Sequence, residues 1–333
     1  MKLATYLTDN GQRLGVVDTE RSIILDPYAA TSAQAGGRDE RLRTMEALIT
    51  AGPDALADLR RLVAAGTSQG DFTTPLSEVR LLAPLPVPAQ FRDCSVFERH
   101  IRDGAAGMAR VSARLQGRSP PEPAGGDGVP AVYRQLPVYY ISNRFNVVGP
   151  DVEIVWPGYS KIMDFELEIA AVIGQGGRNI DASQAAGHIF GYTIFNDFSA
   201  RDRQSVEMTG WLGPAKGKSF DGGNAFGPWI VTPDELGDYR DLKVCVKVNG
   251  EEWIRTDMRG MLHGFEDIIA YISCDETLHP AEIIASGTVG GCCGLELDRF
   301  LADGDVIELD VDRIGILRNT VRMSRDNASH RAT

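Results

Sequence analysis

The stretch DFELEIAAVIG, which begins at Asp164, constrains the fold more than any other part of the chain. Side chains alternate between the two faces of a strand, so Glu166 and Glu168 point the same way. From Ile169 onward both faces are apolar, as in a strand that enters a core. Two carboxylates at that junction repel each other and lose hydration, and a hard divalent cation would compensate for both effects. The plainer alternative is a strand with one solvated face.

The rest of the chain predicts a β-rich α+β protein. Residues 2–26 form short strand-like runs separated by turn signals, and residues 39–67 show helical periodicity. A proline-spaced run, APLPVPA, follows, and from residue 136 onward strand-like segments dominate. We therefore expect a small N-terminal β/α domain (1–84), a catalytic domain (85–325) and a disordered tail (326–333).

Composition limits the classes of partner and compartment. The chain has 34 Lys+Arg against 46 Asp+Glu, which argues against nucleic acid or an anionic membrane surface as the main partner. Its five cysteines lack zinc-finger or CxxC spacing, which favours a reduced cytoplasmic protein. We see no uninterrupted apolar run of about 18 residues, so no membrane span is expected.

A second polar group follows the apolar run HIFGYTIF. The sequence predicts that a helix starts near Asn196, which would put Asp197, Arg201 and Gln204 at i, i+4 and i+7 on one face. A carboxylate, a guanidinium and an amide on one face could hold a metal at one end and a carboxylate substrate beyond it. An Asp–Arg pair on a solvated helix surface is the alternative.

Three further residues stand in suggestive surroundings. Lys218 lies in a glycine-rich loop, where the backbone can approach a ligand closely. His100 lies in the first turn of a helix predicted over 97–114, and Asp103, one turn further on, is a carboxylate that could orient a general base. Glu296 follows the tight segment SGTVGG. Taken singly, such residues are more often a solvated lysine, a structural or exposed histidine and a surface glutamate.

In their order along the chain, DFELEIAAVIG, GYTIFNDFSARDRQ, GKSF and SGTVGG…LEL resemble the motifs of the fumarylacetoacetate hydrolase family. The resemblance covers roughly residues 85–320. It implies a mixed β-roll for the C-terminal domain, commonly a homodimer. It also implies a divalent metal, Mg²⁺ in the first place, with Mn²⁺ or Ca²⁺ as alternatives.

The same resemblance implies roles for individual residues. His100 matches the base, and Glu296 matches its acidic partner, although Asp103 or Glu98 could fill that role instead. The metal carboxylates are implied to be Glu166, Glu168 and Asp197, with Asp93 as a fourth ligand. The residues that match substrate contacts or stabilise developing negative charge are Arg201, Gln204, Lys218, Tyr140 and Thr288.

The function implied is metal-dependent hydrolysis of a carbon–carbon bond in a β-diketo acid, such as an acylpyruvate or fumarylacetoacetate. The expected partner is therefore a small 2-oxo acid. The family also includes 2-oxo acid decarboxylases, tautomerases, dehydratases and lyases that use the same metal site. A non-catalytic metal-binding protein is a further alternative from a different class.

Overall fold

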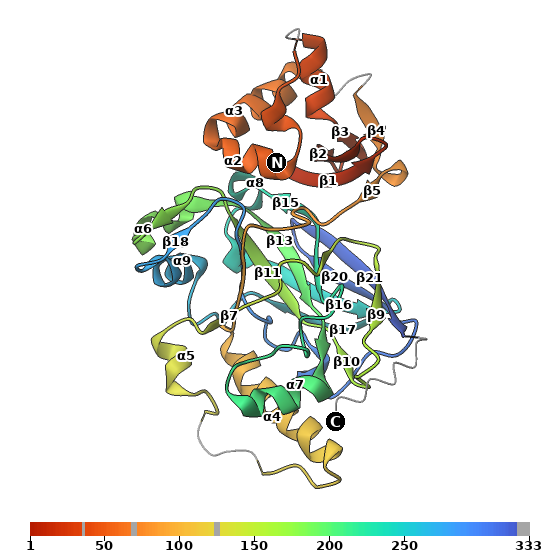
Figure 1. Ribbon diagram of the computed structural model, residues 1–333, viewed down its shortest axis with the longest axis vertical. Coiled ribbons are helices and arrows are strands. Elements are labelled where there is room, and N and C mark those ends of the chain that lie inside the picture. Colours follow the sequence, from red (N-terminus) through yellow and green to blue (C-terminus); the bar gives the residue numbers. More distant parts are fainter. Residues whose placement is uncertain (35–36, 68–71, 123–126, 325–333) are drawn as a thin grey trace.

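Strands dominate the computed structural model, which confirms the β-rich α+β prediction (Figure 1). Within the described residues, twelve strands form one mixed sheet and five strands form a second sheet. The described residues are 1–34, 37–67, 72–122 and 127–324. The predicted tail, 326–333, lies outside them.

The large sheet has the order β4-β3-β2-β1-β15-β13-β11-β19-β6-β7, with β5 paired to β1 and β8 paired to β15. The bounds of its strands are β1 (Lys2–Thr8), β2 (Gly11–Asp18), β3 (Ile23–Leu25), β4 (Thr73–Pro75), β5 (Arg80–Leu81), β6 (Phe91–Cys94), β7 (Tyr139–Ile141), β8 (Val147–Val148), β11 (Leu167–Ile173), β13 (Ile189–Asp197), β15 (Asn224–Val231) and β19 (Ile283–Ala285).

The second sheet has the order β17-β16-β20-β21-β9 and lies beside the first (Figure 1). Its strands are β9 (Glu153–Trp156), β16 (Lys243–Val248), β17 (Glu251–Asp257), β20 (Val306–Val311) and β21 (Gly315–Met323). Two short pairs complete the described strands: β10 (Met163–Asp164) with β14 (Ser199–Ala200), and β12 (Gly177–Arg178) with β18 (Thr277–Leu278).

Strand β11 lies in the middle of the molecule and is buried along its whole length. It pairs antiparallel with β13 on one side and with β19 on the other. Ile169 and Ile173 belong to the main core, which also contains residues of the second sheet. Ala170 and Val172 point the other way, into a core shared with the N-terminal helices. The apolar run therefore reflects burial on both faces, as predicted.

The N-terminal strands extend the large sheet, and the N-terminal helices pack against it. Helices cover this end of the molecule, as the periodicity over 39–67 predicts, with a break at Gly52 and Pro53. Strand β1 joins β15 in the register Leu3↔Ile230, and Leu48 shares a core with Phe226. The boundary at residue 84 stays a prediction. The helices here are α1 (Pro27–Gln34), η1 (Glu40–Leu42), α2 (Met45–Ala51), α3 (Pro53–Leu62) and η2 (Val63–Thr67).

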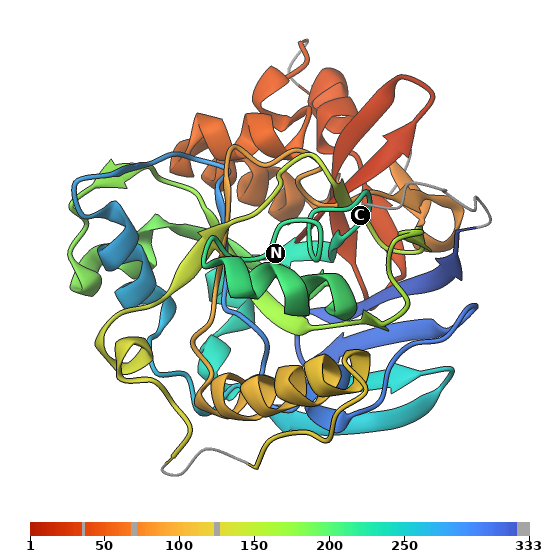
Figure 2. The same ribbon diagram turned by 60° about the horizontal axis from the view of Figure 1, so that its bottom comes forward.

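At the opposite end, α4 (Glu98–Leu115) and α7 (Arg201–Glu207) lie side by side (Figure 2). Helix α4 confirms the helix predicted over 97–114. Among the described helices, none combines the length and apolar character needed to cross a membrane. The remaining helical segments are η3 (Leu76–Glu78), α5 (Ala131–Gln135), α6 (Ala182–Ala185), η4 (Ala186–His188), η5 (Met208–Gly210), α8 (Pro233–Leu236), η6 (Tyr239–Asp241), α9 (Phe265–Ser273) and α10 (Gly294–Leu297).

Burial of β11 makes a direct prediction about stability. Ile169→Ala should lower the free energy of unfolding by about 2–5 kcal/mol, because it removes fully buried methyl groups and leaves a cavity. The matched change Ile316→Ala, at a side chain 45% exposed on β21, should lower it by less than about 1 kcal/mol. Urea denaturation followed by circular dichroism measures both. Equal losses in the two variants would contradict the central placement of β11.

Candidate active site

A cavity of about 830 Å³ opens between α4, α7 and the ends of the central strands. Glu166 and Glu168 both line this cavity, as expected for two side chains on the same face of a strand. Glu296 and Asp103 are the predicted site residues that do not line it. The others that do are Asp93, His100, Tyr140, Asp197, Arg201, Gln204, Lys218 and Thr288.

Three carboxylates from three strands converge at this cavity. Asp93 comes from β6, Glu168 from β11 and Asp197 from the end of β13, and one oxygen of each lies within 4.8 Å of the others. All three side chains are buried. Burial, followed by repulsion from the neighbouring carboxylates, raises the pKa of Glu168 well above its usual range. The pKa of Asp197 is raised by the same causes, although Lys218 opposes them.

The residues present fit a divalent cation. Oδ1 of Asp93, Oδ1 of Asp197 and Oγ1 of Thr288 are buried and have no hydrogen-bond partner among the described residues. A buried polar atom without a partner is costly, and a bound cation would satisfy the two carboxylate oxygens. Carboxylate oxygens are the donors that Mg²⁺, Mn²⁺ and Ca²⁺ prefer. Asp93, the fourth ligand implied by the resemblance, is thus part of the cluster.

Glu166 stands beside the three-carboxylate cluster and is held mainly by cations. Its Oε1 lies 2.6 Å from Nη2 of Arg201, and its Oε2 lies 2.8 Å from Nζ of Lys218. Burial alone would raise the pKa of Glu166, but Arg201, Lys218 and His100 together hold it below the usual range. Glu166 is therefore ionised in this arrangement. Its role as a metal ligand stays a prediction.

Lys218 is a buried cation, so the interpretation as a solvated loop lysine is wrong. Its ammonium group forms ion pairs with Glu166 and Asp197. Desolvation would lower the pKa of Lys218, but these carboxylates outweigh it and the pKa is raised. The glycine-rich loop thus delivers one positive charge to Glu166, which precedes β11, and to Asp197 at the end of β13.

The helix predicted to begin near Asn196 begins instead at Arg201, so Asp197 is the last residue of β13. Asn196 and Asp197 stay in the sheet because they pair with Ala225 and Asn224 of β15. The expected helical face containing Asp197 is therefore wrong; only Arg201 and Gln204 share the helix.

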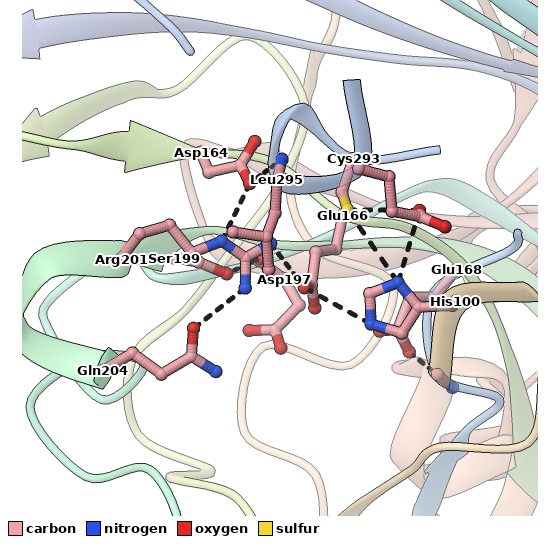
Figure 3. A network of polar contacts seen from close by, with 12 residues as sticks. His100, Asp164, Glu166, Glu168, Asp197, Ser199, Arg201, Gln204, Cys293 and Leu295 are labelled. Carbon is pink, nitrogen blue, oxygen red and sulfur yellow. Dashed lines mark hydrogen bonds and ion pairs between the residues drawn. The ribbon is translucent and has the colours of Figure 1, made fainter. Parts of the chain in front are cut away.

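Arg201 is fully buried. The alternative of an Asp–Arg pair on a solvated helix surface is therefore excluded. Figure 3 shows its guanidinium between three partners: Nε donates to Asp164 at 2.8 Å, Nη2 to Glu166 at 2.6 Å and Nη1 to Oε1 of Gln204 at 2.8 Å. This planar group is thereby fixed in orientation. Gln204 in turn is oriented with its amide nitrogen free of the arginine.

His100 at the start of α4 faces a carboxylate on each side. Its Nδ1 lies 3.3 Å from Oε2 of Glu296, and its Nε2 lies 3.9 Å from Oε1 of Glu166. Glu296 is itself fixed by the backbone N–H of Gly291, 3.0 Å from each carboxylate oxygen. A histidine held on one nitrogen by a fixed carboxylate can accept a proton on the other.

The two alternative partners of His100 are engaged elsewhere. Asp103 forms ion pairs with Arg99 and Arg102, and Glu98 forms one with Arg134. The expectation that Asp103 orients the histidine is therefore not supported by the geometry, which brings Glu296 to that nitrogen. A carboxylate three residues along α4 points toward the solvent-exposed arginines.

Tyr140 and Thr288, both implied as substrate contacts, line the same cavity. The hydroxyl of Tyr140 donates to Oδ2 of Asp197 at 3.2 Å, and burial raises the pKa of this phenol. Thr288 is 2% exposed and lines the same cavity. The structure thus brings Tyr140 to the carboxylates and Thr288 to the wall of the cavity.

Two residues of this network were not singled out from the sequence. Asp164 accepts hydrogen bonds from Arg201 and from the backbone N–H groups of Gly294 and Leu295. Cys293 places its sulfur 3.2 Å from Glu296 and 3.8 Å from Nδ1 of His100. The sequence feature that could have pointed to Asp164 is its position as the first residue of DFELEIAAVIG. Nothing in the spacing of Cys292 and Cys293 points to His100.

The comparisons with known proteins agree with the motifs. The family model "Fumarylacetoacetate (FAA) hydrolase C-terminal" matches residues 116–322. The human mitochondrial oxaloacetate tautomerase FAHD2A is 36% identical over 188 residues, which are 56% of this chain and 59% of that protein. A 2,4-didehydro-3-deoxy-L-rhamnonate hydrolase from Sphingomonas sp. (strain SKA58) is 33% identical over 187 residues, 56% of this chain and 65% of that protein. The match thus spans less than two thirds of these relatives.

Solved structures share the fold over nearly the whole chain. Fumarylacetoacetate hydrolase from the psychrophile Exiguobacterium antarcticum has a TM-score of 0.70 and 27% identity, covering 97% of this chain and 100% of that one. Maleylpyruvate hydrolase from Sphingobium sp. SYK-6, solved with manganese(II) and pyruvate, has a TM-score of 0.69 and 23% identity, covering 98% and 100%. The second likeness is one of fold alone.

The carboxylate cluster predicts a thermal shift on metal addition. Mg²⁺ or Mn²⁺ at about 100 times its Kd should stabilise the protein by about 2.7 kcal/mol and raise Tm by a few degrees. Glu168→Gln should abolish that shift because it removes one of the three converging carboxylates. Asp103→Asn, outside the cavity, should keep it. Differential scanning calorimetry of metal-stripped protein measures all three; an undiminished shift in Glu168→Gln would contradict the site.

Proposed function

The chain belongs to the fumarylacetoacetate hydrolase family, and on that premise we propose that it is a metal-dependent hydrolase that cleaves a carbon–carbon bond in a β-diketo acid of the acylpyruvate kind. The observation that carries this proposal is the pairing of His100 with Glu296 at the edge of the carboxylate cluster. Hydrolysis needs a base that can activate water, and this pair supplies one beside oxygens suited to a cation.

The residues that would hold the ion are Asp93, Glu168 and Asp197. A divalent cation there would supply Lewis-acid chemistry and a template for two oxygens of a 2-oxo acid. We propose Mg²⁺, with Mn²⁺ or Ca²⁺ as alternatives. The fold neighbour maleylpyruvate hydrolase, whose structure contains manganese(II) and pyruvate, is consistent with this class of ion and ligand.

In the proposed reaction, Nε2 of His100 removes a proton from water as the water oxygen attacks the distal carbonyl carbon. Glu296 stabilises the imidazolium that results, because it holds Nδ1 at 3.3 Å. The bond between that carbon and the methylene group then breaks, and its electron pair goes to the methylene carbon. His100 can return its proton there, which releases pyruvate and a carboxylic acid.

The cations of the cavity support the developing negative charge. Lys218 and Arg201 line the cavity and are preorganised by ion pairs, so they need no reorganisation during the reaction. The amide of Gln204 is oriented by Arg201, which leaves its N–H groups for a substrate oxygen. These assignments rest on position and on the family motifs together.

Tautomerisation of a 2-oxo acid is the second candidate, because the 36%-identical human relative is an oxaloacetate tautomerase. This reaction would use the same cation and His100 as a proton carrier, without attack by water. Loss of the enol absorbance of oxaloacetate without release of pyruvate would favour it. Stoichiometric pyruvate from an acylpyruvate would favour the hydrolase.

The base assignment predicts a large effect of one substitution. His100→Ala should lower kcat for pyruvate release by about 10²–10⁴-fold, because the group that activates water is lost. The assay couples pyruvate to lactate dehydrogenase with Mg²⁺ at saturation.

Asp103→Asn is the matched control on the same helix and should leave kcat nearly unchanged, since Asp103 pairs with arginines outside the cavity. Glu296→Gln should lower kcat while the affinity for Mg²⁺ stays the same, because Glu296 lies behind His100 rather than in the carboxylate cluster. An unchanged kcat in His100→Ala would remove the base assignment.

A further inference from the structure

The cavity is much larger than the head group that its polar residues can hold. At about 830 Å³ it falls in the range of sites that enclose ligands of drug size, whereas pyruvate has only six non-hydrogen atoms. Every charged residue that lines it belongs to the site already described. The remaining lining is mainly apolar and includes Ile101, Met108, Met208, Trp211, Leu212 and Leu295.

These apolar residues come from α4, from the segment that follows α7 and, in the case of Leu295, from α10. Ile101 and Met108 are seven residues apart on α4 and share its cavity face. Trp211 and Leu212 lie in the segment that follows α7. Met108 also packs against the small cluster that contains Leu295. The apolar surface is thus continuous with the wall that carries His100.

Trp211 and Leu212 are 94% and 98% exposed, which is unusual for large apolar side chains at the mouth of a cavity. The base of their segment is nevertheless fixed. The carboxylate of Glu207 accepts hydrogen bonds from the backbone N–H groups of Ala215, Lys216 and Gly217, at 2.9 to 3.0 Å. An anchored segment with an uncovered apolar tip is suited to contact a ligand that enters the cavity.

The charges of the cavity disfavour a second carboxylate on the substrate. Arg201 is already paired with Asp164 and Glu166, and Lys218 with Glu166 and Asp197. No other Lys or Arg lines the cavity among the described residues.

Two arginines on the bordering helices are also engaged. Arg102 of α4 pairs with Asp103, and Arg134 of α5 pairs with Glu98 and Asp127. A distal carboxylate would lose hydration in this cavity without gaining a cation, whereas a distal alkyl or aryl group would gain from burial.

We propose that the substrate carries a bulky apolar acyl group at the end distal to its 2-oxo acid head, and that this group packs against Met108, Trp211 and Leu212. The proposal rests on the proposed hydrolase function and names its substrate class. It places dicarboxylic substrates, oxaloacetate among them, at a disadvantage.

A matched pair of substrates tests the charge argument. The enzyme with Mg²⁺ is assayed for pyruvate release from 2,4-dioxooctanoate and from 2,4-dioxooctanedioate, which differ only in a terminal methyl or carboxylate. We expect kcat/KM to favour the methyl-ended acid by at least about tenfold. Equal values, or a preference for the dicarboxylate, would overturn the proposal.

Two variants locate the subsite. Trp211→Ser should lower kcat/KM for 2,4-dioxooctanoate by about fivefold or more while leaving 2,4-dioxopentanoate, whose acyl group is only acetyl, nearly unchanged. Phe145→Ser is the matched control, because Phe145 is 73% exposed but does not line the cavity. Met108→Lys places a cation on the apolar wall and should reduce the preference for the methyl-ended acid about tenfold.

The outcomes separate this proposal from the proposed function. If no dioxo acid releases pyruvate, the hydrolase assignment fails. Calorimetry with Mg²⁺ then compares the binding of 2-oxooctanoate with that of 2-oxooctanedioate. Tighter binding of the dicarboxylate overturns the apolar subsite as well.

A second copy of the chain is the other partner that could cover Trp211. If Trp211→Ser turns a dimer into monomers in sedimentation and leaves the substrate preference intact, the subsite is overturned.

Discussion

The interaction on which this structure depends is the burial of carboxylates at the end of an otherwise apolar strand. Glu166 and Glu168 stand where β11 leaves the core, and the neighbouring strands add Asp197 and Asp93. Buried like charges are unfavourable unless cations compensate for them. Lys218 supplies part of that compensation in the fold itself, and the oxygens that remain without partners fit a divalent ion.

The surrounding architecture fixes these charged groups from several directions. The two-sided core holds β11 rigidly, and the pairing of β13 with β15 carries Asp197 to the same edge. The buried carboxylate of Asp164 accepts hydrogen bonds from the guanidinium of Arg201 and from the backbone N–H of Gly294. It therefore links Arg201 to the start of the short helix that carries Glu296. Rigid strands thus place the carboxylates, while helix α4 brings the histidine and an apolar wall. Polar chemistry and apolar recognition come from different elements.

Much of this could be predicted from the sequence, because local patterns were strong there. The run from Ile169 to Ile173 predicted a doubly buried strand, and the alternation before it placed Glu166 and Glu168 on one cavity-facing side. The helix start at Asn196 was wrong because sheet pairing outweighed local capping preference, a tertiary effect that spacing does not show. Asp103 stood at a good helical spacing from His100, but the arginines beside it determine where its carboxylate points. The burial of Lys218 and the approach of Cys293 to His100 likewise depend on contacts between distant segments.

Anomalous diffraction from crystals grown with Mn²⁺ tests the central claim most directly, since it locates the ion independently of activity. The account predicts one strong peak within about 2.0–2.6 Å of oxygens from Asp93, Glu168 and Asp197, with the ammonium group of Lys218 still beside Glu166. It predicts the loss of that peak in Glu168→Gln crystals. A peak elsewhere, or none at these carboxylates at saturating Mn²⁺, would contradict the claim that their burial serves to bind a divalent cation.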